Sequence, residues 1–237
     1  GDKLPIKRVI QSRFDNGEII EMDFAQLEFR VAAFLSQDSQ AMQDILEGVD
    51  VHQNTANVIG CSRQDAKAHT FKPLYGGMSG TDEEKKYYSY FRKRYKGITS
   101  WQETTEDTAI ATSFVTLPSG RQYYFEGIKR ASWGGSNFYT QVRNYPVQGF
   151  ATGDIVPAAC IDIYKQMKGM RTRLINTVHD SIIIDAHPGE VDSVLKKLKK
   201  ACDGITQSIN KRYNIDFNVP LDYEIKKGHN WLDLKRI

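Results

Sequence analysis

Cysteine is scarce in this 237-residue sequence, and its three copies, Cys61, Cys160 and Cys202, form no C-x-x-C pair. An odd number without paired spacing argues against a disulfide framework and a zinc ribbon, and it is typical of a reducing compartment. Long hydrophobic runs are also missing, since no stretch approaches the roughly 20 residues that span a bilayer and no signal-peptide pattern opens the sequence. These absences predict a cytoplasmic protein with no membrane partner.

Neither sign of charge is in large excess. The sequence holds 32 Lys plus Arg and 29 Asp plus Glu, a net charge of +3, so any polyanion must bind a local basic patch. Hydrophobic residues make up 40%, enough for the core of one large or two small domains. The first residue is not Met, and we expect the sequence to be part of a longer protein.

Strand patterns lie near both ends of the sequence, with a mainly helical block between them. A buried strand is predicted over 17–24, a hairpin over 173–185 and a last strand over 219–226. The pattern favours helices over the ranges 25–36, 62–72, 81–96, 137–167 and 189–212. The fold class predicted is α+β, an antiparallel sheet backed by helices, with a mainly helical insertion.

Two carboxylates occupy strand ends. Asp23 ends the first strand, and Asp180 lies at the turn of the hairpin in "TVHDSIIIDAH". If these strands are neighbours, the two carboxylates converge at one edge, where divalent metal would neutralise them; two Mg²⁺ ions held in this way promote phosphoryl transfer. The alternative is that Asp23 is a helix N-cap and Asp180 a turn former.

The segment "RQDAKAHTF" places cations and an aromatic ring along one side of a predicted helix. Arg63, Lys67 and Phe71 are spaced i, i+4, i+8. Such a face could hold a triphosphate and stack a base or sugar, while Lys67 could protonate a departing pyrophosphate. The alternative is a solvated charged stripe with Phe71 turned to the core.

Three separate motifs resemble the polymerase region of family A DNA polymerases. "DFAQLEFRVAAFLSQD" resembles the family's first motif, D-Y-S-Q-I-E-L-R; "RQDAKAHTFKPLYGG" resembles the second, R-x3-K-x3-F-x3-Y-G; and "TVHDS" resembles the third, usually H-D-E. Intervening segments such as "NYPVQGFATGDI" and the C-terminal "VPLDYEIKKGHNW" follow in the family's order. The resemblance covers nearly the whole sequence.

The resemblance implies a two-Mg²⁺ centre, in which Mn²⁺ may substitute, and a dNTP site. Asp23, Asp180 and the backbone carbonyl of Phe24 would be the metal ligands, and Lys67 the general acid. Glu28 would exclude a ribose 2′-hydroxyl. The implied dNTP-binding residues are Glu28, His52, Arg63, Lys67, Phe71 and Tyr75.

The resemblance also implies a DNA primer-template as partner, contacted by Asn144, Gln148 and His179. Residues 1–40 and 134–237 would form the palm and 41–133 the fingers. The family's thumb and 3′-5′ exonuclease domains are not in this sequence, and a bacterial or phage-infected cell would be its location. Whether the source is phage, bacterium or organelle stays open.

Two departures from the family pattern stand out. Ser181 replaces the usual Glu, so the site loses a charge while keeping its two aspartates. Pro73 lacks the N–H that would continue the second-motif helix, so that helix should be kinked there, which makes the placing of Tyr75 less certain. Each assigned residue also has a plain structural alternative: Tyr75 as core, Glu28 as a partner of Arg30 or Arg63, and His52 as a first-turn histidine.

The predicted function is template-directed DNA synthesis, in which a primer 3′-hydroxyl attacks the α-phosphate of a dNTP. Two alternatives stay open. A two-metal nuclease would use the same aspartates on water but has no need of the face that carries Arg63, Lys67 and Phe71. A catalytically weak or inactive DNA-binding fragment would tolerate Ser181 and the missing thumb.

Overall fold

A computed structural model describes residues 5–237, and the chain divides into two compact units. The sheet unit runs up to Leu27 and takes in Thr152–Asp216 and Leu221–Ile237. The helical unit comprises Glu28–Ala151 and Phe217–Pro220. These limits differ from the palm and fingers boundaries expected at 40/41 and 133/134, because residues 28–40 and 134–151 pack within the helical unit.

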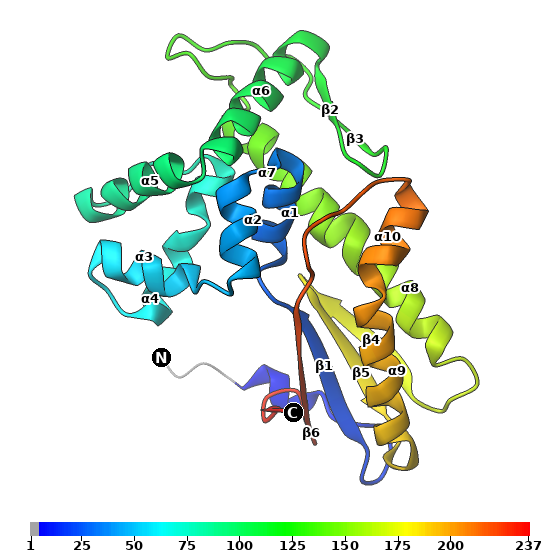
Figure 1. Ribbon diagram of the computed structural model, residues 1–237. Helices are drawn as coiled ribbons and strands as arrows, with labels where there is room; N and C mark the ends of the chain where they lie inside the picture. The colour runs from blue at the N-terminus through cyan, green and yellow to red at the C-terminus, as the bar shows by residue number, and fades with distance from the viewer. Residues whose placement is uncertain (1–4) are drawn as a thin grey trace. The chain divides into compact units, whose positions relative to one another are not determined.

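The sheet unit is built on a five-stranded sheet of order β4-β5-β1-β6-β7, whose pairs are all antiparallel (Figure 1). Its strands are β1 (Glu18–Phe24), β4 (Arg173–Val178), β5 (Ser181–Ala186), β6 (Tyr223–Gly228) and β7 (Lys235–Arg236). This arrangement confirms the α+β class and the antiparallel sheet predicted from the sequence. The last long strand begins at Tyr223 rather than at residue 219.

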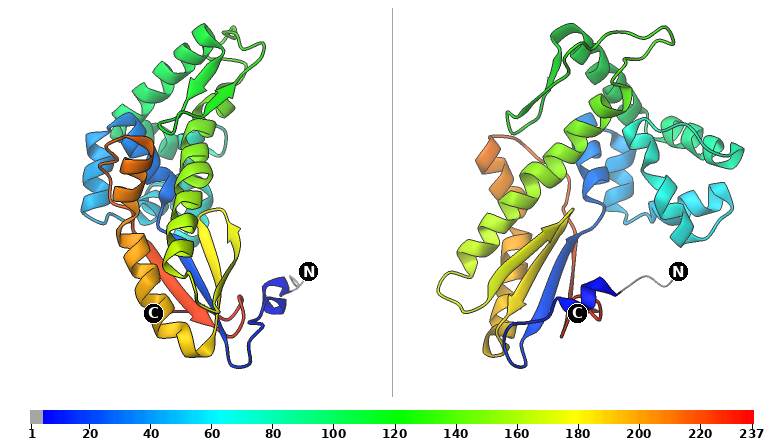
Figure 2. Two further views of the ribbon diagram at one scale, coloured as in Figure 1. Left: turned by 90° about the vertical axis from the view of Figure 1, so that its right-hand side faces the viewer. Right: turned by 180° about the vertical axis from the view of Figure 1, so that it is seen from behind.

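Alternation along the central strand explains why β1 forms. Ile20 and Met22 are fully buried, and Phe24 is nearly so, on one face of the sheet, whereas Glu21 and Asp23 point to the other. Three helices, α8 (Val156–Gln166), α9 (Val191–Asp203) and α10 (Ile205–Tyr213), complete this unit, and Figures 1 and 2 show α8 and α9 running beside the sheet.

The single helix predicted over 189–212 is wrong. The chain forms a short 3₁₀ turn, η4 (Pro188–Glu190), then α9, and a new helix begins at Ile205 after Gly204. Glycine has the lowest helix propensity apart from proline, so it is the natural point for the break. The break lets Val194 and Leu198 of α9 and Ile205 and Ile209 of α10 all become buried.

The helical unit contains seven α-helices among its described residues (Figure 1). They are α1 (Leu27–Ser36), α2 (Ser39–Leu46), α3 (Val51–Ile59), α4 (Arg63–Thr70), α5 (Asp82–Arg94), α6 (Lys96–Thr112) and α7 (Tyr139–Phe150), with the hairpin β2 (Phe114–Thr116) and β3 (Gln122–Tyr124). Side chains of Asp50, Ser62 and Thr81 cap α3, α4 and α5, which fixes where these helices start.

Proline marks the helix boundaries that the sequence predicted. Helix α4 ends at Thr70, and the chain continues as the 3₁₀ turn η2 (Lys72–Tyr75), which contains Pro73. Pro146 lies inside α7, and a π-helical turn, Ala151–Ile155, separates α7 from α8. Pro157 falls in the first turn of α8, directly after this π-helical turn.

None of the helices within residues 5–237 has the length and apolar character needed to cross a membrane.

Candidate functional site

Asp23 and Asp180 come from adjacent strands of the sheet unit. Asp23 on β1 lies directly opposite Ser181 on β5, and Asp180 immediately precedes Ser181. The backbone N–H of Phe24 donates to the carbonyl oxygen of Asp180 at 3.3 Å. The two strands are therefore neighbours, as the sequence argument required, and both carboxylates belong to one end of the sheet.

The turn that carries His179 and Asp180 is only two residues long. It joins β4, which ends at Val178, to β5, which begins at Ser181. His179 is exposed and has a φ of 54°, in the left-handed region that non-glycine residues seldom occupy. Residues in such sparsely populated backbone conformations are often found at functional sites. The conformation of His179 is therefore consistent with a functional role for this turn.

Asp23 has a neutral neighbour on one side and an acidic one on the other. The Ser181 hydroxyl donates to Oδ1 of Asp23 at 2.6 Å. Glu224 lies opposite Asp23 on β6, and its carboxylate is paired with Arg236 at 2.9 Å and Lys226 at 3.9 Å. The Asp23 carboxylate thus lies half-buried without an arginine or lysine partner among the described residues.

The donor set of this sheet end fits a hard divalent cation. Carboxylate oxygens are the ligands that Mg²⁺ prefers, and Mg²⁺ usually keeps several waters. Within residues 5–237, no group of three or more His, Cys, Asp or Glu side chains gathers as a metal site. A cation here would therefore rely on two carboxylates completed by backbone, water or substrate oxygens.

Helix α4 carries the two basic residues that the sequence predicted for the site. Arg63 and Lys67 are both exposed and one helical turn apart. Nε of Arg63 donates to Oδ2 of Asp50 at 2.7 Å, so this cation is held by the carboxylate that caps α3. The hydrogen bond from Arg63 lowers the pKa of Asp50 and in turn raises the pKa of Arg63.

His52 projects from the first turn of α3. Its Nδ1 lies 3.0 Å from Oγ1 of Thr70, the last residue of α4. Burial lowers the pKa of His52, and the charges of Arg63 and Lys67 lower it further. The imidazole is therefore neutral at neutral pH, and it can offer a triphosphate a single N–H rather than a full positive charge.

Phe71 follows the last residue of α4 instead of lying on its helical face. The ring is half-buried, stacked on Phe29 with centroids 5.7 Å apart and edge-on to His52 at 5.2 Å. One side of Phe71 thus packs on the core residue Phe29, while the ring keeps partial exposure beside His52.

Glu28 and Tyr75 are in direct contact. The Tyr75 hydroxyl donates a short hydrogen bond to Oε2 of Glu28, which joins η2 to the start of α1. The alternative pairings considered for Glu28 are not the ones observed, since Arg30 donates to the carbonyl of Pro220 at 2.5 Å and Arg63 pairs with Asp50. Gly76, with a φ of 78°, ends η2 directly after Tyr75.

Asn144 and Gln148 lie one turn apart on α7. The Asn144 Oδ1 atom is buried and has no hydrogen-bond partner among the described residues, whereas Gln148 is exposed. The preceding residue, Arg143, anchors the helix through a buried ion pair with Glu106 at 2.9 Å. Asn144 and Gln148 therefore project from a helix that is fixed at its middle.

The predicted site residues fall into two groups, one in each unit. Asp23, Phe24, His179 and Asp180 belong to the sheet unit; Glu28, His52, Arg63, Lys67, Phe71, Tyr75, Asn144 and Gln148 belong to the helical unit. Sequence reasoning missed Asp50 as the partner of Arg63, and it missed Thr70 and Phe29 as contacts of His52 and Phe71. Only the capping position of Asp50 could have been found in the sequence.

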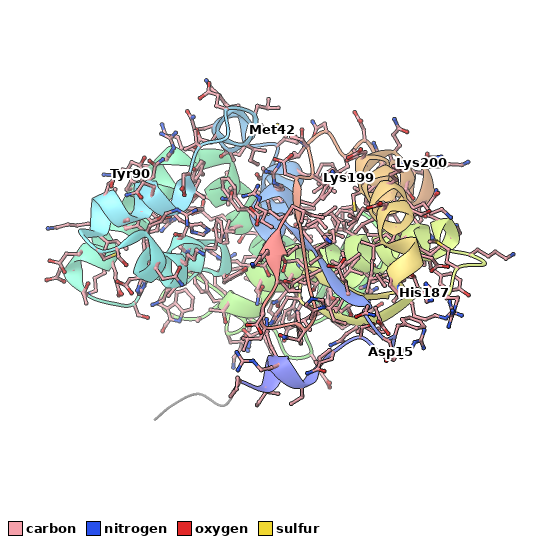
Figure 3. All side chains as sticks on the ribbon, turned by 90° about the horizontal axis from the view of Figure 1, so that it is seen from below. Asp15, Met42, Tyr90, His187, Lys199 and Lys200 are labelled. Carbon is pink, nitrogen blue, oxygen red and sulfur yellow. The ribbon has the colours of Figure 1, made fainter. Side chains whose placement is uncertain are left out.

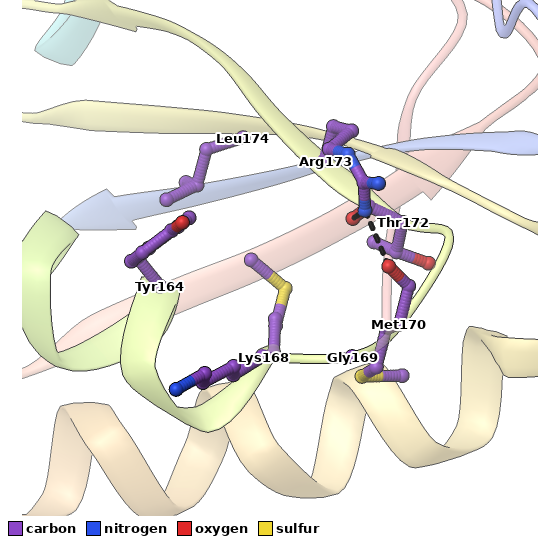
Figure 4. A pocket seen from close by; sticks show the side chains of 8 residues that line it. Tyr164, Lys168, Gly169, Met170, Thr172, Arg173 and Leu174 are labelled. Carbon is purple, nitrogen blue, oxygen red and sulfur yellow. Dashed lines mark hydrogen bonds between the residues drawn. The ribbon is translucent and has the colours of Figure 1, made fainter.

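A separate hollow of about 350 Å³ lies between the end of α8 and the start of β4. Figure 4 shows Tyr164, Lys168 and Leu174 around it, while Arg173 turns back to donate to the carbonyl oxygens of Met170 and Thr172. On the same unit, Lys199 and Lys200 project outward from α9 (Figure 3). None of these side chains is a buried, unpaired polar group that would indicate a ligand.

Comparison with known proteins was made on sequence and on structure. Residues 2–233 match the sequence profile of DNA polymerase family A. DNA polymerase I from Caldicellulosiruptor bescii is 27% identical over 92% of this chain and 27% of its own length. DNA polymerase I from Pseudomonas aeruginosa is 29% identical over 90% of this chain and 25% of its own. The chain thus spans about a quarter of the length of these relatives.

A solved structure has the same fold. The POL domain of Pol1 from M. smegmatis, in complex with DNA primer-template and dNTP, matches 97% of this chain and 42% of that chain. The TM-score is 0.75 at 21% sequence identity. At this identity the likeness concerns the fold, and it agrees with the sheet and helices described above.

Proposed function

Because the chain belongs to DNA polymerase family A, we propose that it performs the synthetic step of a DNA polymerase: addition of dNMP from a dNTP to a primer 3′-hydroxyl, with release of pyrophosphate. The observation that carries the proposal is the pairing of β1 with β5. That pairing brings Asp23 and Asp180, which are far apart in the sequence, to neighbouring positions at one end of the sheet.

In this proposal the palm comprises residues 1–40 and 134–237, which include the sheet unit with its carboxylates. The fingers comprise residues 41–133 of the helical unit, which include helix α4. Primer-template DNA and dNTP are the partners, and the parts of a longer polymerase that grip duplex DNA or proofread would lie outside this chain.

Asp23, Asp180 and the Phe24 carbonyl would hold Mg²⁺, or Mn²⁺ in its place. When bound as a pair, such ions neutralise charge on the phosphates and on the attacking and leaving oxygens. The protein's contribution is to hold the two carboxylates: Asp23 by strand pairing and by Ser181, and Asp180 by the short turn and its backbone bond to Phe24.

In the fingers, exposed cations bind the triphosphate. Arg63 and Lys67 offer positive charge from one side of α4, and His52 offers a neutral N–H nearby on α3. Lys67 is exposed and has no ion-pair partner within the described chain, so its ammonium is available to donate a proton to the departing pyrophosphate.

Selection of the sugar falls to Glu28, Phe71 and Tyr75. The hydrogen bond from Tyr75 holds the Glu28 carboxylate in one position, where it excludes a 2′-hydroxyl. Phe71 is backed by Phe29, so its ring can meet the sugar and base without being displaced.

Asn144 and Gln148 contact the primer-template from the minor-groove side, where all base pairs present similar acceptors. The buried Oδ1 atom of Asn144 supports this role. A buried acceptor without a hydrogen bond costs stability, and a contact with the primer-template would explain why it is kept. His179 contacts the primer terminus from the exposed turn beside Asp180.

The test is single-nucleotide extension of a labelled primer-template with Mg²⁺ and each dNTP, at high protein concentration. Template-matched addition should occur with the wild-type chain and disappear with Asp180→Ala. The matched control is Asp15→Ala, which removes an exposed carboxylate of the same unit and should leave extension intact.

Two other outcomes would replace the proposal. Release of nucleotides from the primer without dNTP would assign the aspartates to a two-metal nuclease. Primer-template binding that is unaffected by Mg²⁺ and dNTP, with no extension, would make the chain a DNA-binding element.

A further inference from the structure

Ser181 stands in direct register with Asp23 across β1 and β5. Residues opposite one another on antiparallel strands project from the same face of the sheet, with their Cβ atoms close together. The Ser181 hydroxyl uses this placement to donate to Oδ1 of Asp23 at 2.6 Å, and both side chains are half-buried. The contact is therefore set by strand pairing and not by a mobile loop.

We propose that Ser181 is a positioning residue for the Asp23 carboxylate, fixing its orientation so that Oδ2 stays directed to a divalent cation. The inference rests on the proposed function, because it assigns Ser181 to the same cation site. In this role Ser181 acts through Asp23 and does not itself need to touch the metal.

The chemistry of a hydroxyl suits this role. A serine O–H donates one hydrogen bond and brings no charge, so it adds no positive charge that would compete with the cation. An ionised glutamate at position 181 could not donate, and its charge would repel that of Asp23. A lysine or arginine would hold Asp23 but neutralise it. Of these residues, only serine would orient the Asp23 carboxylate without repelling or neutralising it.

The other flank of Asp23 offers no competing partner. Glu224, opposite Asp23 on β6, is occupied by Arg236 and Lys226 and can only repel Asp23. Within the described chain, Ser181 is the side chain that hydrogen-bonds to the Asp23 carboxylate. Removal of its hydroxyl should free the carboxylate to rotate and weaken cation binding.

The same sheet provides a matched control. The Ser12 hydroxyl donates to Oδ1 of Asp185 at 2.6 Å, and Asp185 lies on β5 opposite Ile19, toward the other end of β1. This second serine–aspartate hydrogen bond has the same length and chemistry. Asp185, however, also forms an ion pair with Arg13, and it is not one of the proposed cation ligands. Ser12→Ala should change stability without changing cation affinity.

The experiment measures Mn²⁺ binding to the full chain by the electron paramagnetic resonance signal of free Mn²⁺, with primer-template present and no turnover. Ser181→Ala should weaken binding by about tenfold or more, as loss of a partner to a metal ligand usually does. Ser181→Thr, which keeps the hydroxyl, should restore affinity to within about twofold. Ser12→Ala should bind as wild type.

Two results separate failure of this inference from failure of the proposed function. Wild-type affinity in Ser181→Ala, with binding abolished in Asp23→Asn, would overturn the positioning role alone. Wild-type affinity in Asp23→Asn would remove the cation site itself and with it both proposals. Ser181→Cys, nearly isosteric and a weak donor, replaces Ser181→Ala if that variant fails to give cooperative thermal unfolding, and it should weaken binding in the same direction.

Discussion

The Tyr75 hydroxyl donates to the Glu28 carboxylate and thereby couples the turn after α4 to the first turn of α1. The two residues belong to different sequence motifs and are 47 positions apart. The contact means that Glu28 is held by a neutral donor, so its negative charge and its position are both retained. A carboxylate held in this way can act as a rigid obstacle to a ribose 2′-hydroxyl.

Glu28→Ala is expected to reduce discrimination against ribonucleotides. Removal of the side chain opens the space beside the sugar, and the ratio of kcat/KM for dNTP to that for rNTP should fall by about tenfold or more. Tyr75→Phe keeps the carboxylate but loses its donor, so its effect should be smaller and in the same direction. Unchanged ratios in Glu28→Ala would show that the carboxylate does not face the sugar.

Asp50→Asn is expected to tighten dNTP binding. The Asp50–Arg63 pair is exposed, and such pairs contribute up to about 1 kcal/mol, so releasing Arg63 should lower the dNTP Kd by at most about fivefold. Asparagine still caps α3, so stability should change little. Asp65→Asn removes a charge from α4 itself without touching Arg63 and serves as control. Weaker dNTP binding in Asp50→Asn would show that Asp50 orients Arg63 instead of competing for it.

His52 should make the protein less stable as pH falls. Burial and the neighbouring cations lower its pKa in the folded state below the unfolded value of about 6.5. The unfolded chain therefore binds more protons, and the contribution to stability is present above about pH 6.5 and is lost as pH falls from there through the folded pKa. Unfolding by denaturant at pH 7.5 and 5.5 should show the decrease, and His52→Gln should reduce it.

Nucleotide binding should reverse that pKa shift. A triphosphate beside His52 favours the protonated ring, so dNTP binding near pH 6 should be accompanied by proton uptake. Calorimetry in buffers of different ionisation enthalpy measures this uptake. Equal uptake by wild type and His52→Gln would place the triphosphate elsewhere.

Phe71→Tyr is expected to increase incorporation of dideoxynucleotides. If Phe71 lies against the incoming sugar, a hydroxyl on the ring would supply a polar contact near the site of the missing 3′-hydroxyl. Chain-termination ratios at matched dNTP and ddNTP concentrations measure the change. The ring keeps its packing on Phe29 in the variant, so a loss of stability is not expected.

The Arg143–Glu106 pair should be a large contributor to the stability of the helical unit. Both side chains are about 95% buried, so Arg143→Met leaves an uncompensated carboxylate and should cost about 3–5 kcal/mol. The double variant with Glu106→Gln should cost less than Arg143→Met alone. Arg130→Met breaks an exposed pair with Asp107 and should cost at most about 1 kcal/mol, which makes it the control.

Local sequence signals predicted much of the fold. The strand predicted over 17–24 forms β1, and the helix predicted over 62–72 forms α4, which ends at Thr70 before Pro73. These signals succeed because each depends on neighbours within a few residues. The sequence argument took the pairing of β1 with the later hairpin only as a condition for bringing the two aspartates together, and the structure meets that condition.

Contacts between segments that are distant in the sequence were harder to predict from it. The hydrogen bond from Arg63 to Asp50 joins two helix starts, and both residues already had a local explanation in the sequence. The break at Gly204 escaped notice because the hydrophobic positions on either side keep a helical spacing. Ser181 was recognised as unusual, but the hydroxyl's bond to Asp23 follows from strand register, which the sequence alone does not fix to one residue.

The central position of β1 also constrains how the protein is made. This strand lies near the start of the chain, yet its two neighbours, β5 and β6, are roughly 160 and 200 residues further on. Closing loops of that size must precede the contacts that stabilise the sheet, and such topologies fold slowly. During synthesis, residues 18–24 would keep an apolar face unpaired until the segments that form β5 and β6 had also been made, and an exposed strand of this kind is prone to aggregate before its partners are present.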